Sequence, residues 1–233
     1  TMFRTILIIS FCLGFGASSY GKSLDSKTCM LSSASIDFNQ LNSRIVFTTG
    51  NDDADQTVND EAVALIKTTG IKPSLRLYDD SDAPNALAIK AKLFENDMTI
   101  LLGRSLINES LEYKPAYDEN GKYLFHATHF SQVIAIMMHE WAHLAQYENG
   151  VRGPTVKLEL MADIMAGWYM HKRLDVSNDA PLTRAAAQLY SLGDFNFHSP
   201  SHHGTPKQRE NAYWYGYNLY QNGHREFWGA MVQ

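Results

Sequence analysis

The spacing of apolar residues divides the chain into a strand-containing middle and a helical C-terminal half. Three stretches of strand length, Leu75–Tyr78, Ala86–Leu93 and Met98–Leu102, carry apolar or alternating patterns and are separated by Asp, Pro and Asn residues typical of turns. Together they predict a small, mainly antiparallel sheet. Helices are expected over Val58–Thr69 and Gly103–Tyr113.

From Thr128 onward the apolar pattern is helical. Apolar side chains recur at spacings of three and four up to Gly150, which predicts a helix that ends there. Further helices are expected over Thr155–Arg173, from Asp179, and from a capping box at Thr205-Pro206-Lys207-Gln208. The predicted fold class is therefore α+β.

The N-terminal residues have the features of a secretory signal peptide. Arg4 precedes the apolar segment Thr5–Ala17, which is too short to cross a bilayer, and the small residues Ala17-Ser18-Ser19 follow. We expect residues 1–19 to be a signal peptide and the mature protein to be periplasmic or secreted; an uncleaved N-terminal anchor is the alternative. No later stretch reaches 18 apolar residues, so no membrane span is expected in the mature chain.

Residues 20–60 are rich in Ser, Asn and Asp, which is typical of a loosely structured lead-in before a folded domain over residues 61–233. The run Asn51-Asp52-Asp53-Ala54-Asp55 resembles the start of a calcium loop. An EF-hand loop needs Gly at its sixth and Glu at its twelfth position, and neither the frame starting at Asn51 nor the one starting at Asp53 supplies them. We therefore expect a solvated acidic loop.

Composition places the chain among globular proteins. Of its 233 residues, 45% are hydrophobic and 19% are charged, and the formal net charge is −5. This length and composition suit one folded domain. Because there is no surplus of Lys and Arg to neutralise phosphates, nucleic acid is not an expected partner.

The chain has 2 Cys and 9 His, which limits the kinds of metal site that it could build. Cys12 lies in the predicted signal peptide, so Cys29 alone remains and has no partner for a disulfide within the chain. A zinc site made only of Cys needs four thiolates. We therefore expect any transition metal to be bound by imidazole and carboxylate groups.

The helix predicted before Gly150 carries the sequence His139-Glu140-Trp141-Ala142-His143. Side chains at positions i and i+4 lie on one face of a helix, so His139 and His143 can bind one ion. Glu140 lies about 100° further round the helix, close to such an ion without binding it, which suits a base for a metal-bound water. The alternative is a buried helix whose histidines are satisfied by hydrogen bonds.

The next helix carries Glu159-Leu160-Met161-Ala162-Asp163 after a segment rich in Gly and Pro that allows the chain to reverse. Glu159 can then supply a third ligand, and Asp163 can accept a hydrogen bond from a ligand histidine and set its tautomer. An ordinary exposed helix face is the alternative for both carboxylates. Burial is favoured by the apolar neighbours Leu158, Leu160, Met161, Ile164, Met165 and Trp168.

These motifs resemble those of the gluzincin metallopeptidases, whose signature is H-E-x-x-H followed by E-x-x-x-D. The chain is similar to the neutral zinc metallopeptidases in three ordered segments: His139–Gln146, Glu159–Asp163 with Ala166-Gly167, and His203-Gly204-Thr205-Pro206-Lys207-Gln208-Arg209. The segment Pro84-Asn85-Ala86-Leu87-Ala88 is similar to a strand motif of the HtpX-like peptidases. The resemblance covers residues 84–215.

The resemblance implies a zincin-like fold with one zinc ion (Zn2+) that activates water, and Glu140 as the general base for peptide-bond hydrolysis on exported proteins or peptides. Two alternatives stay open: a non-catalytic binding or chaperone-like module that keeps the fold, and a zinc hydrolase of a non-peptide amide.

A developing oxyanion needs a further hydrogen-bond donor. His203 is the first candidate for this catalytic role and Arg209 and His202 are the others, with helix capping or a surface position as the alternative for each. Asn85 and Ala86 would line a cleft where an extended peptide pairs with a sheet edge formed by the strands over residues 85–93 and 98–102. Packing in the core is the competing role for these two residues.

Overall fold

The computed structural model describes residues 38–81, 84–111, 130–174, 179–197, 199, 202–227 and 229. The predicted signal peptide and Cys29 lie outside the described residues. Helices and a small sheet form one α+β arrangement, which confirms the predicted class. Among the described residues, no helix is both long and apolar enough to cross a bilayer.

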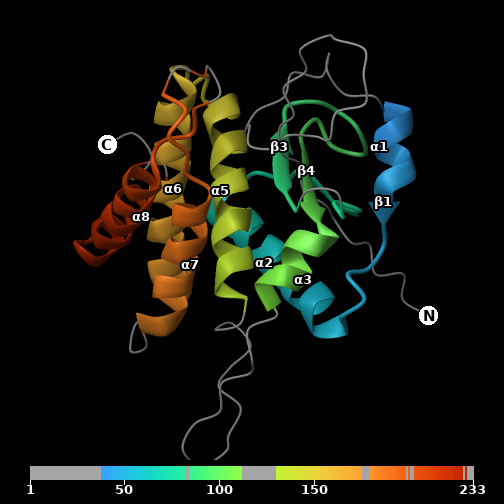
Figure 1. The fold of residues 1–233 in the computed structure, drawn as a ribbon, viewed down its shortest axis with the longest axis horizontal. Helices are drawn as coiled ribbons and strands as arrows, with labels where there is room; N and C mark the ends of the chain where they lie inside the picture. The colour runs from blue at the N-terminus through green and yellow to red at the C-terminus, as the bar shows by residue number, and fades with distance from the viewer. Residues whose placement is uncertain are drawn as a thin grey trace, which may run out of the picture.

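The elements of the first half are α1 (Phe38–Arg44), β1 (Ile45–Val46), α2 (Asp52–Thr69), β2 (Ser74–Tyr78), β3 (Ala86–Ile89), β4 (Thr99–Gly103) and α3 (Arg104–Leu111). Those of the second half are α5 (Ser131–Glu148), α6 (Thr155–Arg173), α7 (Asp179–Ser191) and α8 (Pro206–Gln221). Figure 1 shows α5, α6 and α7 running side by side. Helix α8 lies on one side of this group, and the sheet lies on the opposite side, next to α5.

The sheet is mixed, with strand order β1-β2-β4-β3. The outer pairs, β1 with β2 and β3 with β4, are antiparallel, but the central pair of β2 and β4 is parallel. The expected antiparallel pairing is present in the two outer pairs but is wrong for the central pair, β2 with β4. After β2 the chain forms β3 at the edge of the sheet and then returns as β4 between β2 and β3. This long connection allows β2 and β4 to pair in parallel.

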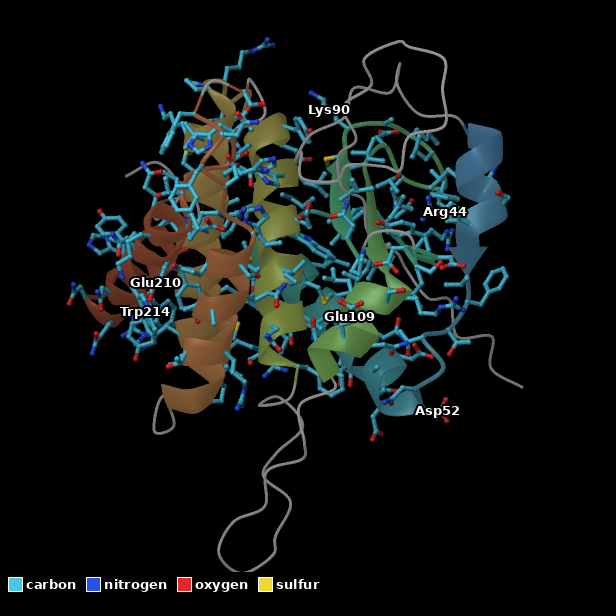
Figure 2. All side chains as sticks on the ribbon, in the orientation of Figure 1. Arg44, Asp52, Lys90, Glu109, Glu210 and Trp214 are labelled. Carbon is cyan, nitrogen blue, oxygen red and sulfur yellow. The ribbon has the colours of Figure 1, made fainter. Side chains whose placement is uncertain are left out.

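The acidic run at residues 51–55 does not form a loop, contrary to our expectation. Asn51 caps α2 by accepting hydrogen bonds from the N–H groups of Asp53 (3.0 Å) and Ala54 (3.1 Å). Carboxylates in a first turn are stabilised by the helix dipole, so the helix begins at Asp52 rather than at Val58. Asp52 lies at the outer end of α2 (Figure 2).

The described part of the expected lead-in takes part in the fold. β1 pairs with β2, and the proposed domain boundary after residue 60 falls inside α2. The expected strand over Ala86–Leu93 ends earlier, at Ile89, whereas α6 and the capping box at Thr205 lie where they were predicted.

Helix α5 is the centre of the molecule, and nearly all of its residues are buried. A helix that is apolar on every face must be covered on every face, and α5 packs against α2, α6, α7 and β3. Figure 2 shows side chains filling the layer between α5 and the sheet. Trp141 is fully buried, and its indole Nε1 donates a hydrogen bond to the carbonyl of Ile71 (3.3 Å).

Helices α6 and α8 pack closely at two glycines. A Cβ atom at Gly167 would lie 1.8 Å from the carbonyl oxygen of Tyr213, and one at Gly216 would lie 1.7 Å from that of Ile164. Both obstacles are backbone atoms, which cannot move without shifting a whole helix. The two glycines therefore set the distance at which α8 can approach the residues of α6.

A buried carboxylate joins α2 to α6 near the other end of α6. Glu61 is 1% exposed and accepts hydrogen bonds from the hydroxyl of Tyr169 and from Nε of Arg173 (3.0 Å). Burial raises the pKa of Glu61 above its usual 4.5, and the two hydrogen-bonding partners only partly oppose this effect.

We predict that Gly167→Ala lowers the free energy of unfolding by about 1–3 kcal/mol or more, since the added methyl group meets backbone atoms. Gly153→Ala is the matched control, because its Cβ would meet only the flexible side chain of Lys157 at 3.3 Å. Urea denaturation of both variants measures the effect. Equal stability of the two variants would contradict the close packing of α6 and α8.

A second prediction concerns the dependence of stability on pH. Because the folded state raises the pKa of Glu61, this carboxyl contributes most to stability at acidic pH, and the contribution is lost as the pH rises through the folded pKa. In Glu61→Gln the side chain is neutral at every pH. We therefore expect the variant to gain stability relative to wild type in urea denaturation as the pH rises above the usual glutamate pKa of 4.5. A difference that stays constant as the pH rises would contradict the raised pKa.

Candidate metal centre

Helix α5 brings two imidazole rings together in the core. His139 and His143 are one helical turn apart, are at most 2% exposed, and meet edge to face with ring centroids 4.6 Å apart. Their Nε2 atoms are separated by 3.0 Å. The predicted i, i+4 geometry is thus present in the structure.

The other nitrogen of each ring faces an oxygen acceptor. Nδ1 of His139 donates to Oδ1 of Asp163 (2.9 Å), and Nδ1 of His143 donates to Oε1 of Gln146 (2.9 Å). The amide of Gln146 is oriented by its own Nε2, which donates to the carbonyl of Leu158 (2.8 Å). Because a neutral imidazole has one N–H, both rings turn the lone pairs of Nε2 toward each other.

The carboxylate of Glu159 completes this group from α6. Its Oε2 lies 3.4 Å from Nε2 of His139, and its Oε1 lies 3.4 Å from Nε2 of His143. The side chain is fully buried, and neither oxygen has a hydrogen-bond partner among the described residues. A cation bound between this buried carboxylate and the two imidazole lone pairs would stabilise the negative charge.

One potential ligand atom from each of His139, His143 and Glu159 lies within 4.8 Å of the others, and all three residues are buried. This group could hold a metal ion. It is the set of ligands expected from the two sequence motifs, brought together by α5 and α6.

Asp163 is held between a histidine and an arginine. Besides accepting from His139, it accepts from Nε (2.8 Å) and Nη2 (2.9 Å) of Arg209, and Nη2 also lies 3.5 Å from Oε2 of Glu159. Arg209 is 1% exposed, and its Nη1 donates to the carbonyl of Leu192 (3.5 Å). Arg209 therefore lies against both carboxylates of α6, and its single positive charge offsets one of their two negative charges.

The burial and charges of the site shift the pKa values of two of its members. Burial lowers the pKa of His139, but the carboxylates of Asp163 and Glu159 outweigh it and raise the value above 6.5. Burial raises the pKa of Glu159, but His143, His139 and His203 outweigh it and hold the value well below 4.5. The two carboxylates thus stabilise positive charge at this point, whether it is a proton on the imidazole or a bound cation.

Glu140 is buried on α5, next to His139 in sequence, and is not part of the group that could hold a metal. Its Oε1 has no hydrogen-bond partner among the described residues. Burial raises its pKa to about 8, against the opposing charge of His143. A carboxylate that changes protonation near neutral pH has the property required of a general base.

The loop between α7 and α8 brings one of the two candidate histidines to the site. Nδ1 of His203 lies 3.4 Å from Oε2 of Glu159, and its Nε2 is buried without a partner in the described part of the chain. His202 instead contacts Oδ1 of Asp194 through Nδ1 (2.7 Å). Asp194 also accepts from the backbone N–H of His203 (2.9 Å), so one carboxylate fixes both residues.

Asn85 precedes β3 and Ala86 begins it, and within the described part of the chain β3 is an edge strand that pairs with β4 alone. The backbone N–H of Asn85 donates to Oδ2 of Asp80 (2.8 Å), and Ala86 is 1% exposed. Strand β4 lies inside the sheet, so the expectation that both strands form an open edge is wrong for β4. β3 packs against α5, which places this edge beside the helix that carries the two histidines.

Two residues with clear roles were not predicted. Gln146 was noted only as part of the resemblance, although its position three residues after His143 puts it on the same helix face. Asp194 lies in the loop between α7 and α8 and has no motif around it. Its contact with residues 202 and 203 depends on how the loop closes.

No protein-family model matches the chain, and no curated protein or solved structure matches it either. A function must therefore be proposed from the residues and geometry of this site.

We predict that the purified protein binds one divalent transition-metal ion, measured by elemental analysis and calorimetry with zinc. His143→Ala combined with Glu159→Ala should weaken binding by more than about 100-fold, since loss of a residue that only orients a ligand already costs 10–100-fold. His224→Ala, which removes an exposed imidazole, is the control and should bind as wild type does. Undiminished binding in the double variant would exclude this ligand set.

Proposed function

We propose that the chain is a zinc metallopeptidase with a zincin-like fold. The observation that carries the proposal is that His139, His143 and Glu159 converge in the core. The Nε2 lone pairs of the two imidazoles face the carboxylate, whose oxygens have no hydrogen-bond partner among the described residues. Two nitrogen ligands and one carboxylate are the donor set of several catalytic zinc sites. Three protein ligands leave room for a water or a substrate oxygen.

Zinc, when bound, would polarise the scissile carbonyl and make water acidic enough to attack it near neutral pH. Oε1 of Glu140 accepts the proton of that water and then gives it to the leaving amine. This oxygen is suited to accept the proton because no other described group donates a hydrogen bond to it. The raised pKa of about 8 makes the ionised carboxylate a stronger base toward that proton than an ordinary glutamate is.

His203 is the proposed hydrogen-bond donor for the developing oxyanion. Its Nδ1 lies near Glu159, its backbone is fixed by Asp194, and its buried Nε2 has no other partner among the described residues, so the ring donates from Nε2 in the Nε2–H tautomer. Arg209 acts through Asp163 as a positioning residue, because it holds the carboxylate that orients His139.

The substrate is proposed to be a peptide or protein in extended form. β3 is an edge strand of the described sheet beside α5, and an extended peptide could add to it by backbone hydrogen bonds. Asn85 would shape the end of this edge rather than pair with the peptide, because its N–H donates to Asp80 and its carbonyl accepts from Gly103. The signal-peptide features predicted from residues 1–19 indicate that these substrates lie outside the cytoplasm.

We predict that Glu140→Gln retains zinc but loses peptide hydrolysis by about 10²–10⁴-fold, the usual contribution of a general base. Glu148→Gln is the matched control, since Glu148 is an exposed carboxylate on the same helix. Casein cleavage and zinc content are measured on the same samples.

Wild-type activity in zinc-loaded Glu140→Gln would contradict the proposed mechanism. Zinc binding by wild type without hydrolysis of any peptide would instead favour a binding module, and hydrolysis restricted to other amides would contradict the substrate class.

A further inference from the structure

The side chain of Gln146 contacts both helices that carry the proposed metal ligands. It is fully buried in the last turn of α5. Its Oε1 lies 2.9 Å from Nδ1 of His143, and its Nε2 donates to the carbonyl of Leu158 (2.8 Å), which precedes Glu159 on α6. The backbone carbonyl of Gln146 also accepts from the N–H of Val151 (2.9 Å). One residue thus joins one ligand, the backbone beside another ligand, and the turn between the two helices.

The carbonyl of Leu158 determines which way the amide of Gln146 points. A carbonyl oxygen only accepts hydrogen bonds, so the donor Nε2 must face it, and Oε1 then faces His143. Because Oε1 also only accepts, the proton of a neutral His143 ring lies on Nδ1. The lone pair of Nε2 therefore stays on the side of His139 and Glu159, where an ion would bind.

Without this amide, the proton of His143 would have a better position on the other ring nitrogen. Nε2 of His143 lies 3.4 Å from Oε1 of Glu159, a buried carboxylate oxygen without a hydrogen-bond partner among the described residues. A proton on Nε2 could be donated to this oxygen, and it would then occupy the lone pairs of two ligands at once.

A neutral amide prevents this arrangement without adding charge to the site. The carboxylates of Glu159 and Asp163 already share the single guanidinium of Arg209. A third carboxylate in the place of Gln146 would add negative charge to a buried group that has little positive charge to balance it.

We infer that Gln146 is a positioning residue of the metal centre. It keeps the proton of His143 off Nε2, and it holds the backbone next to Glu159 so that both ligands face one ion. The inference rests on the metal ligands of the proposed function and adds the residue that keeps two of them ready to bind. Hydrogen-bonding partners of this kind are known to orient ligand histidines and to set metal affinity.

The test compares the full wild-type chain with Gln146→Met, in which the new side chain is also unbranched but has no amide. Nitrogen–proton correlation spectra of the metal-free proteins, recorded at one alkaline pH where an imidazole has a single proton, show which ring nitrogen carries it. Wild type should have the His143 proton on Nδ1, and the variant should have it on Nε2. Zinc affinity, measured by competition with a chelator, should fall about 10–100-fold in the variant.

Two further variants separate this role from a general loss of packing. Gln132→Met makes the same change at a partly buried glutamine of α5 that contacts Gln188, and it should leave the His143 proton and the zinc affinity as in wild type. Gln146→Glu retains an oxygen that accepts from His143, so the proton should stay on Nδ1 in this variant.

A His143 proton on Nε2 in wild type would overturn the inference without any variant. A proton that stays on Nδ1 in Gln146→Met would also overturn it, even with weaker zinc binding, because the effect would then be one of packing alone. Wild-type zinc affinity in Gln146→Met, or an equal loss in Gln132→Met, would do the same. Failure of wild type to bind zinc would instead count against the proposed function, because the position of the His143 proton is measured in the metal-free chain.

Discussion

The structure depends on stabilising two carboxylates, Glu159 and Asp163, that α6 carries into the core. A buried carboxylate is costly unless charged or hydrogen-bonding groups surround it. Imidazoles from α5 and the guanidinium of Arg209 from α8 provide these groups, with His139 and Arg209 both bonded to Asp163. Three helices must therefore meet at fixed distances, and the remaining lone pairs of the histidines and Glu159 converge where a cation would complete the balance.

Close packing makes this meeting of helices possible. Arg209 can reach Asp163 only because α8 lies against the backbone of α6, and Gly167 and Gly216 provide that approach. On the other side, Trp141 anchors α5 to the start of β2 through Ile71. The candidate metal site is consequently built among buried, closely packed helices, whereas the loop that carries His203 depends on the hydrogen bonds of Asp194.

Features that depend on neighbouring residues could be predicted from the sequence. The helix period puts His139 and His143 on one face, and the capping box at Thr205 begins α8 where expected. Asn51 is also a local signal, because it caps a helix whose acidic first turn comes before the apolar pattern that begins at Val58. Features that depend on distant residues were missed: the parallel pairing of β2 with β4, and the bonding of Arg209 to Asp163, 46 positions away in sequence. Apolar periodicity indicates burial but does not identify the partner across a sheet or a helix contact.

The central claim is that His139, His143 and Glu159 bind one zinc ion in the core, and crystals grown with zinc would test it most directly. Anomalous diffraction recorded above and below the zinc absorption edge should show one strong peak about 2.0–2.2 Å from Nε2 of each histidine and from a carboxylate oxygen of Glu159. A protein that shows no peak between α5 and α6, or a peak held by other residues, would contradict the account.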